Sequence, residues 1–259
     1  MRINKTREKL MRGEHVIGTF FHSGSPLVMD AIGLSGMDYV IIDKEHSPIA
    51  IETAADLIRT CEARDITPFV RIKEVSRSSV LKLLDLGAKG LIVPNLHSVD
   101  EVKKLIEWAK YKPIGDRGMA MGRGVDFGLG TDPDIWKHWA NVNEQTMLMP
   151  MCETRELLEN IETVAALDGV DGIFVGPCDL SISLDKPGEF FDPVVLDALK
   201  RITKACRDNG KFSLIFAPNA EMADKFVNEI GFDGVGSAID VNLVLSGYLK
   251  LVKDLRKVM

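Results

Sequence analysis

One apolar run in the chain ends in a short cluster of titratable side chains, Asp43, Glu45 and His46. An aspartate beside a histidine can orient the imidazole ring, select its tautomer and raise its basicity, which makes the pair a candidate for proton transfer. A structural role is the alternative, because His46 directly precedes Ser47-Pro48 and a histidine at such a turn can act as a cap or a buried polar group. The residues alone leave both interpretations open.

Two carboxylates follow two later apolar runs, Glu153 after residues 147–151 and Asp179 after residues 167–177. Two acids from neighbouring strands can hold a hard divalent ion such as Mg²⁺ or Mn²⁺, with water and substrate completing its shell. Each acid also has a structural interpretation. Glu153 stands where a helix begins and would favour its N-terminus, and Asp179 would cap a short turn.

Arg71 lies inside the apolar run at 68–72, where an unpaired guanidinium would be costly to bury. It therefore predicts either an internal ion pair with Asp43 or Glu45, or a fixed positive charge that holds a substrate carboxylate or a developing enolate. Lys73 is a candidate Schiff-base amine only if desolvation lowers its pKa, and we expect it to be solvated.

The remaining histidines lack an acidic neighbour of this kind, and we interpret them as structural, although one of them stands at the end of the first apolar run. They are His15, His22, His97 and His138.

The elements that must position these groups follow a recurring pattern. A helix-like stretch ends in a glycine turn, and a continuously apolar run follows, at residues 34–43, 86–95, 167–177 and 230–239. Glycine suits the left-handed end of a helix, and an unbroken apolar run suits a strand that is buried on both faces. Further strand candidates lie at residues 16–20, 68–72, 147–151 and 212–216.

About eight β/α units in this length predict a (β/α)₈ TIM barrel over residues 1–259, as a single domain. A doubly wound sheet is the structural alternative, but VIGTFFHSGSP lacks the GxGxxG phosphate loop that would favour it. Helices are expected at 51–63, at 98–110 behind a capping box, and after Asp192-Pro193. The long stretch 113–146 is interpreted either as a functional loop or as an interface segment.

Composition excludes several classes of function. The chain of 259 residues has 32 Lys and Arg against 38 Asp and Glu, a net charge of −6, which suits neither a nucleic-acid backbone nor an anionic membrane. No apolar run is long enough for a membrane helix, and the start shows no export signal. The four scattered cysteines form no CxxC pair and are expected to be reduced, which predicts a cytoplasmic protein.

Several motifs resemble, in order and over nearly the whole chain, the HpcH/HpaI family of class II, metal-dependent 2-oxo-acid aldolases. They are DKEH-SP (43–48), FVRIKE (69–74), LLDLGAKGLIVP (83–94), GDRGM (115–119), Glu153 after a strand, VDGIFVGPCDLS (170–181) and GFDGVGSAID (231–240). The most specific of them are D-x-E-H and F-V-G-P-x-D-L-S.

This resemblance implies a barrel of the phosphoenolpyruvate/pyruvate-binding superfamily type, assembled as a hexamer with sites near subunit interfaces. Glu153 and Asp179 match the family's metal ligands. Asp43 and His46 match its acid–base dyad, with His46 as the base. Arg71 matches the arginine that contacts the pyruvate oxygen, and it is expected to bind substrate and to take part in catalysis. Asp85 matches a catalytic aspartate that family members lend to a neighbouring subunit's site. The backbone around Gly176, Pro177, Cys178 and Asp179 matches the loop that holds the pyruvate carboxylate.

The expected activity is reversible aldol cleavage of a 4-hydroxy-2-oxo acid to pyruvate, or a related 2-oxo acid, and an aldehyde, through a metal-stabilised enolate. The expected cofactor is Mg²⁺ or Mn²⁺, with Co²⁺ or Ca²⁺ as ions that crystals could contain, and the expected partners are small molecules and other copies of the chain.

One position departs from the family, because Met151 stands where a glutamine usually precedes the metal-binding glutamate. Because of this departure, a second activity remains an alternative, that of a Claisen-type citrate synthase, which condenses acetyl-CoA with oxaloacetate. A carboxylate-binding protein without turnover is the third possibility.

Overall fold

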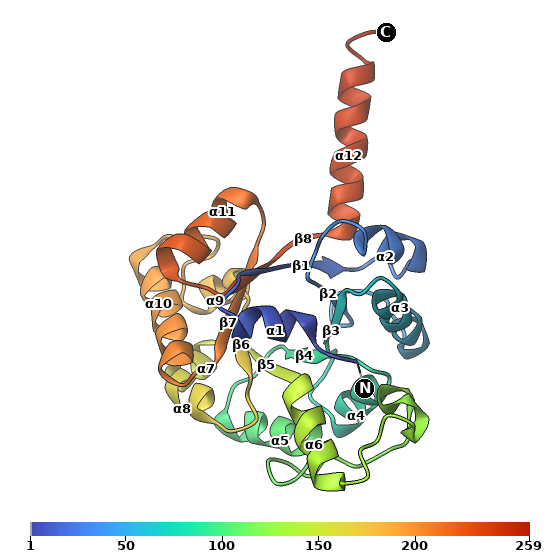
Figure 1. The fold of residues 1–259 in the computed structure, drawn as a ribbon. Helices are drawn as coiled ribbons and strands as arrows, with labels where there is room; N and C mark the ends of the chain where they lie inside the picture. The colour runs from blue at the N-terminus through green and yellow to red at the C-terminus, as the bar shows by residue number, and fades with distance from the viewer. Residues whose placement is uncertain (1) are drawn as a thin grey trace.

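The computed structural model describes residues 2–259 and shows a closed barrel of eight parallel strands in sequence order, which confirms the predicted fold (Figure 1). Each of the eight apolar runs forms a strand. Their bounds are β1 Val16–Phe21, β2 Tyr39–Asp43, β3 Thr67–Arg71, β4 Gly90–Val93, β5 Met147–Cys152, β6 Gly172–Val175, β7 Phe212–Ala217 and β8 Gly234–Ile239.

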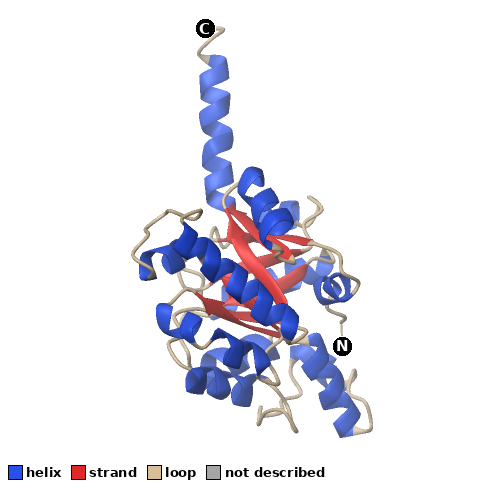
Figure 2. Cartoon of the chain, turned by 90° about the vertical axis from the view of Figure 1, so that its left-hand side faces the viewer, coloured by secondary structure: helices blue, strands red, loops and turns tan. Residues whose placement is uncertain are grey.

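Helices connect the strands and cover most of the outside of the barrel (Figure 2). They are α1 Lys5–Met11, α2 Pro26–Ile32, α3 Ile51–Ala63, α4 Arg77–Asp85, α5 Val99–Ala109, α6 Ile135–Gln145, α7 Arg155–Glu159, α8 Ile161–Ala166, α9 Pro177–Ser183, α10 Pro193–Asp208, α11 Ala220–Asp224 and α12 Asp240–Leu255, with a 3₁₀ segment η1 at Arg123–Gly128 and a π-helical turn η2 at Lys225–Ile230. The expected capping box is present, since Ser98 and Glu101 each accept the other's backbone N–H at the start of α5.

Most strand residues are buried on both faces of the sheet, which explains why the strands form continuous apolar runs in the sequence rather than alternating ones. One core cluster fills the layer between strands and helices, and a second fills the interior of the barrel. The interior cluster includes Phe20, Phe69, Met149, Phe174 and Leu214. The barrel interior is therefore a packed core, and a ligand has room only at an end.

Helix α1 closes the N-terminal end of the barrel and lies across it in Figure 1. Its cap residue Asn4 donates from Nδ2 to the backbone oxygen of Lys89, and Thr6 donates from Oγ1 to that of Asp38, each at 3.1 Å. Both acceptors stand just before strands begin. Because α1 covers this end, the open end is the one where the strands finish, which is where barrels of this type carry their reactive groups.

The stretch 113–146 is ordered as η1 and α6 rather than as a loop throughout. Trp139 of α6 stacks on Tyr111 with ring centroids 5.6 Å apart, and Trp136 meets Trp139 edge-on. The last residue of α6, Gln145, accepts the backbone N–H of Asn4, so this helix ends beside α1. Helix α6 therefore ends at the closed end of the barrel.

Helix α12 leaves the barrel after β8 and extends away from it (Figures 1 and 2). Its large apolar side chains are exposed: Val241, Leu243, Val244, Leu245, Tyr248, Leu249, Leu251, Val252 and Leu255. In an ordinary barrel the helix after the last strand packs back on the sheet. Here Ile17, on the outer face of β1, stays 51% exposed.

Among the described residues, 2–259, no helix is long and apolar enough to cross a membrane.

Candidate active site

A pocket of about 290 Å³ opens at the C-terminal end of the barrel, where the sequence predicts reactive groups. Titratable and polar groups lie among apolar side chains around it. Its lining residues are Phe20, His22, His46, Arg71, Met151, Gly176, Pro177, Cys178, Asp179, Phe216 and Ile239.

The buried carboxylate of Asp43 is the centre of the polar contacts in this pocket. The register of β2 with β3 places Asp43 directly opposite Arg71. Arg71 donates from Nε to Oδ1 at 2.9 Å and from Nη2 to Oδ2 at 2.6 Å, the two-point geometry that arginine forms with a carboxylate. The ion pair that the sequence offered as an alternative for Arg71 is therefore formed. The second possible partner, Glu45, also lies close, with Oε2 3.2 Å from Nη1 of Arg71.

These contacts keep Asp43 ionised. Burial by itself would raise the pKa of Asp43, but the hydrogen bonds and charge of Arg71, with the backbone N–H of Glu45 and the charge of His22, hold that pKa below its usual range. A carboxylate that is a weak base and is fully buried does not itself exchange protons with a ligand. Asp43 is therefore a group that orients its neighbours.

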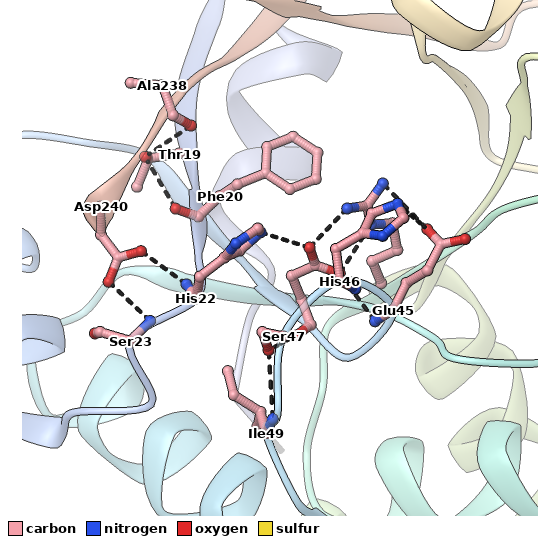
Figure 3. Close-up of polar contacts among 12 residues, drawn as sticks. Thr19, Phe20, His22, Ser23, Glu45, His46, Ser47, Ile49, Ala238 and Asp240 are labelled. Atoms are coloured by element: carbon pink, nitrogen blue, oxygen red, sulfur yellow. Dashed lines mark hydrogen bonds and ion pairs between the residues drawn. The ribbon is translucent and has the colours of Figure 1, made fainter. Parts of the chain in front are cut away.

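The ring that lies against Asp43 is His22, not His46. Nε2 of His22 is 2.6 Å from Oδ2 of Asp43, although its N–H is not aligned closely enough for a hydrogen bond. Asp43 reaches His46 only through the backbone N–H, at 3.4 Å. The His46 ring is 63% exposed and has Nε2 3.6 Å from Oε2 of Glu45 (Figure 3). The expected contact between Asp43 and the His46 ring is thus not formed.

His22 is the site residue that the sequence interpretation missed, since it was assigned a structural role. Its position directly after β1 was the available signal. The pairing of Phe21 with Ile42 brings the two following residues, His22 and Asp43, side by side.

The carboxylate of Glu153 lies after β5 and is 8% exposed. Its Oε1 accepts the backbone N–H of Asn95 at 2.7 Å. The pKa of Glu153 is raised to about 7, chiefly by burial and also by the charges of Asp179 and Glu45, against the opposing effects of the Asn95 hydrogen bond and the charge of Arg71. Glu153 is thus a buried carboxylate with two other acids, Asp179 and Glu45, close enough to influence it.

That donor set fits a hard divalent cation. Glu153 and Asp179 supply two carboxylates, and within residues 2–259 no group of three or more His, Cys, Asp or Glu side chains is arranged to hold a metal ion. Mg²⁺ is commonly bound by one or two carboxylates with its other positions left to water and substrate. The residues present therefore suit an ion that shares its shell with a ligand.

The segment from Gly176 to Asp179 forms one wall of the pocket and the first turn of α9. A Cβ at Gly176 would lie 2.8 Å from Oε2 of Glu153 and 2.7 Å from Cε of Met151, so a larger residue here would displace the ends of these two side chains. Pro177 has no N–H, so the donors in this turn come from Cys178 and Asp179. Met151 is buried against the same glycine and makes that part of the pocket apolar.

Two other residues of interest lie outside the pocket. Asp85, at the end of α4, accepts a hydrogen bond from Nη2 of Arg117 at 2.8 Å. Lys73 is exposed and does not line the pocket, as expected for a solvated lysine. Within the described chain, neither contributes to the site.

Comparison with known proteins identifies a family. The model of the HpcH/HpaI aldolase/citrate lyase family matches residues 16–246. The 2-keto-3-deoxy-L-rhamnonate aldolase of Klebsiella pneumoniae subsp. pneumoniae is 31% identical over 224 residues, which cover 86% of this chain and 82% of that protein. The hydroxypyruvate/pyruvate aldolase of Roseobacter denitrificans is 28% identical and covers 94% of each chain.

Solved structures agree with these matches. The HpcH/HpaI aldolase from Desulfitobacterium hafniense superposes with a TM-score of 0.87 at 26% identity, covering 96% of both chains. The citrate synthase SbnG superposes with a TM-score of 0.83 at 30% identity, covering 97% of this chain and 98% of that one. The same barrel thus occurs with aldol and with citrate-forming chemistry.

Proposed function

Since the chain belongs to the HpcH/HpaI aldolase/citrate lyase family and is a carbon–carbon lyase of the aldolase type, we propose that it reversibly cleaves a 4-hydroxy-2-oxo acid to pyruvate, or a related 2-oxo acid, and an aldehyde. The observation that carries this proposal is the pocket itself. A pair of carboxylates, Glu153 and Asp179, stands across the open end of the barrel from the Asp43–Arg71 ion pair.

Glu153 and Asp179 are the residues that would hold a divalent cation, Mg²⁺ or Mn²⁺. When bound, such an ion supplies a Lewis acid that polarises the 2-oxo group of the substrate. The turn at Cys178 and Asp179 offers backbone N–H groups to the substrate carboxylate. The wall formed by Phe20, Met151 and Phe216 excludes water from the reacting carbons.

Arg71 provides the fixed positive charge of the site. Asp43 holds its guanidinium at two points, so the group is oriented before substrate arrives. In cleavage the C4 hydroxyl gives up its proton to a base as the C4 carbonyl of the aldehyde forms. The C3–C4 bond breaks, and its electron pair moves into the C2–C3 bond while negative charge develops on the C2 oxygen. Arg71 stabilises that charge. A proton is then delivered to C3, a step for which His46, at the edge of the pocket, is the proposed donor.

We also propose that the protein is a homo-oligomer, with a hexamer as the specific expectation. Helix α12 supports this, because a row of exposed apolar side chains along a whole helix is unstable in water and marks an interaction surface. The exposed outer face of β1 at Ile17 lies where the eighth helix of a barrel usually packs. The α12 helix of a second copy has the chemistry to cover that face, as in an exchange of helices between protomers.

The test of the proposed activity is a panel of short aldehydes incubated with pyruvate, before and after EDTA treatment. We expect product only with metal, and restoration by Mn²⁺ or Mg²⁺. Full activity in EDTA, with borohydride trapping of substrate on Lys73, would show a Schiff-base enzyme instead and would refute the metal-dependent proposal.

A citrate-forming Claisen condensation is the second candidate, favoured by Met151 and by the similarity to the citrate synthase SbnG. Thiol release from acetyl-CoA in the presence of oxaloacetate separates the two reactions. Release without any aldol cleavage would select the second candidate.

A further inference from the structure

His22 occupies a position that a merely structural histidine does not need. Its side chain lines the pocket and is 18% exposed, while Nε2 faces the fully buried carboxylate of Asp43. We assign the hydrogen to Nε2, since that atom lies 2.6 Å from an ionised oxygen. Nδ1 is then the basic nitrogen. It is not among the buried polar atoms and has no hydrogen-bond partner among residues 2–259, so it is open to a ligand.

The backbone of His22 is held from the opposite side of the loop. The carboxylate of Asp240, the first residue of α12, accepts the N–H of His22 at 2.7 Å and the N–H of Ser23 at 3.1 Å (Figure 3). Asp240 is itself only 4% exposed. Asp240 thus holds the backbone of His22, while Nε2 of the ring lies against the carboxylate of Asp43.

The strand order decides which part of a substrate His22 meets. In a closed ring of eight strands, β1 lies across the mouth from β5, and β2 lies across from β6. Glu153 follows β5 and Asp179 follows β6. A substrate whose 2-oxo acid end is anchored at these two carboxylates therefore extends its other end toward β1 and His22.

We propose that His22 is a catalytic acid–base residue that exchanges the proton of the C4 oxygen. This inference rests on the proposed aldol function. In cleavage, Nδ1 of His22 takes the proton of the C4 hydroxyl, the C4–O bond becomes the aldehyde carbonyl, and the C3–C4 bond breaks with its electron pair passing to the enolate of the 2-oxo acid. In condensation, the same nitrogen returns the proton to the new alkoxide. Asp43 stabilises the imidazolium that exists between the two events.

His46 suits this step less well. Its ring is mostly exposed, and its nearest acidic group is Glu45 at 3.6 Å rather than a buried carboxylate. The two histidines thus divide the protons of the reaction, with His22 serving the C4 oxygen and His46 serving C3.

The experiment compares two reactions of the intact, metal-loaded protein. The first is cleavage of a 4-hydroxy-2-oxo acid, followed as pyruvate release. The second is exchange of the pyruvate methyl protons for deuterium, followed by NMR, which needs proton transfer at C3 but none at a C4 oxygen. The variants are H22Q, H22A and, as a matched control, H15Q, since His15 is exposed and contacts only the backbone oxygen of Asp233.

The variant H22Q is the decisive one, because a glutamine amide keeps an N–H donor on this side chain but cannot act as a base. We expect H22Q and H22A to lose cleavage by roughly 10²–10⁴-fold and to keep methyl exchange within about threefold, with H15Q unchanged in both. Retained exchange also shows that the variants fold.

Two results would overturn the assignment. If H22Q cleaves at the normal rate, His22 only positions Asp43. If H22Q loses exchange as severely as cleavage, His22 serves the enolate rather than the C4 oxygen. A wild-type protein that shows neither reaction would instead refute the proposed function, and that outcome is distinct from either.

Discussion

Arg71 and Asp43 form a two-point ion pair between neighbouring strands, and both side chains are almost completely buried. Asp43 also faces His22. One carboxylate thus orients the cation of the pocket and a histidine that lines it. An ion pair in this position contributes to stability as well as to the chemistry, because either charge left alone would be buried without a partner.

The variant Asp43→Ala should therefore lower the free energy of unfolding by about 3–5 kcal/mol, the range for removing one partner of a buried pair. Glu162→Ala is the matched control, since Arg201 holds Glu162 in the same two-point geometry at the surface. That loss should be about 1 kcal/mol or less. Urea denaturation measures both, and equal losses would show that burial does not set the strength of the Asp43 pair.

The variant Gly176→Ala tests the close approach of the pocket wall to Glu153. The added methyl would lie 2.8 Å from Oε2 of Glu153, and the backbone at Gly176 is ordinary, so the contact alone is responsible for any effect. Both atoms that the methyl meets end flexible side chains, and we expect the protein to fold. Mn²⁺ affinity, measured by calorimetry, should fall at least about tenfold as the carboxylate is displaced. Gly122→Ala, where the nearest atom is 3.4 Å away, should not change it.

Asp240 connects the start of α12 to the loop that carries His22. Asp240→Ala removes the acceptor of two backbone N–H groups, and Asp240→Asn retains one acceptor oxygen. We expect kcat for cleavage to fall by about tenfold or more in the alanine variant and by less in the asparagine variant. Asp254→Ala, an exposed acid on the same helix, is the control. Steady-state kinetics measure kcat for each variant. A kcat of the Asp240→Ala variant equal to that of the Asp254→Ala control would contradict a positioning role for Asp240.

Charged substitutions on α12 test the proposed assembly. Leu245 and Leu249 are exposed by 59% and 62%, and replacing both with glutamate makes burial against another copy costly. Light scattering coupled to size exclusion should show an oligomer for the wild type and smaller species for the double variant. Lys250→Gln, on the same helix, should leave the mass unchanged. A wild-type protein that runs as a monomer at micromolar concentration would refute the assembly.

Lys89 provides a pH-dependent test of the closed end of the barrel. Burial lowers the pKa of Lys89 to about 8, so between pH 8 and 10.5 the unfolded chain binds a proton that the folded protein does not. Lys89 therefore costs stability below pH 8, and this cost disappears as pH rises to 10.5. The stability of Lys89→Met relative to wild type should fall by up to about 3 kcal/mol over that window. Denaturant titrations at several pH values measure it, and a difference that stays constant would contradict the shift.

Much of the fold could be predicted because its signals are local. The strands β1 to β8 were recognisable as apolar runs, four of them after glycine turns, since a strand buried on both faces must be apolar throughout. The start of α5 was recognisable because Ser98 and Glu101 cap it through contacts three residues apart. The candidate acids and Arg71 could be named because parallel strands bring all their carboxyl ends to one mouth.

What the sequence by itself determined is therefore the barrel, the end of it that carries the chemistry, and the residue types collected there. Only the tertiary structure decided which side chains touch. Asp43 and His46 are near neighbours in the chain, yet the turn after β2 brings only the backbone N–H of His46 to Asp43 and leaves the ring at the exposed edge of the pocket. Strand pairing instead brings His22 to Asp43 from twenty-one positions away. Helix α12 is the second case, because the apolar residues of a segment do not say whether they pack on their own barrel, and here they are exposed. Such contacts depend on register and on the direction of each chain segment, and neither is encoded in local spacing.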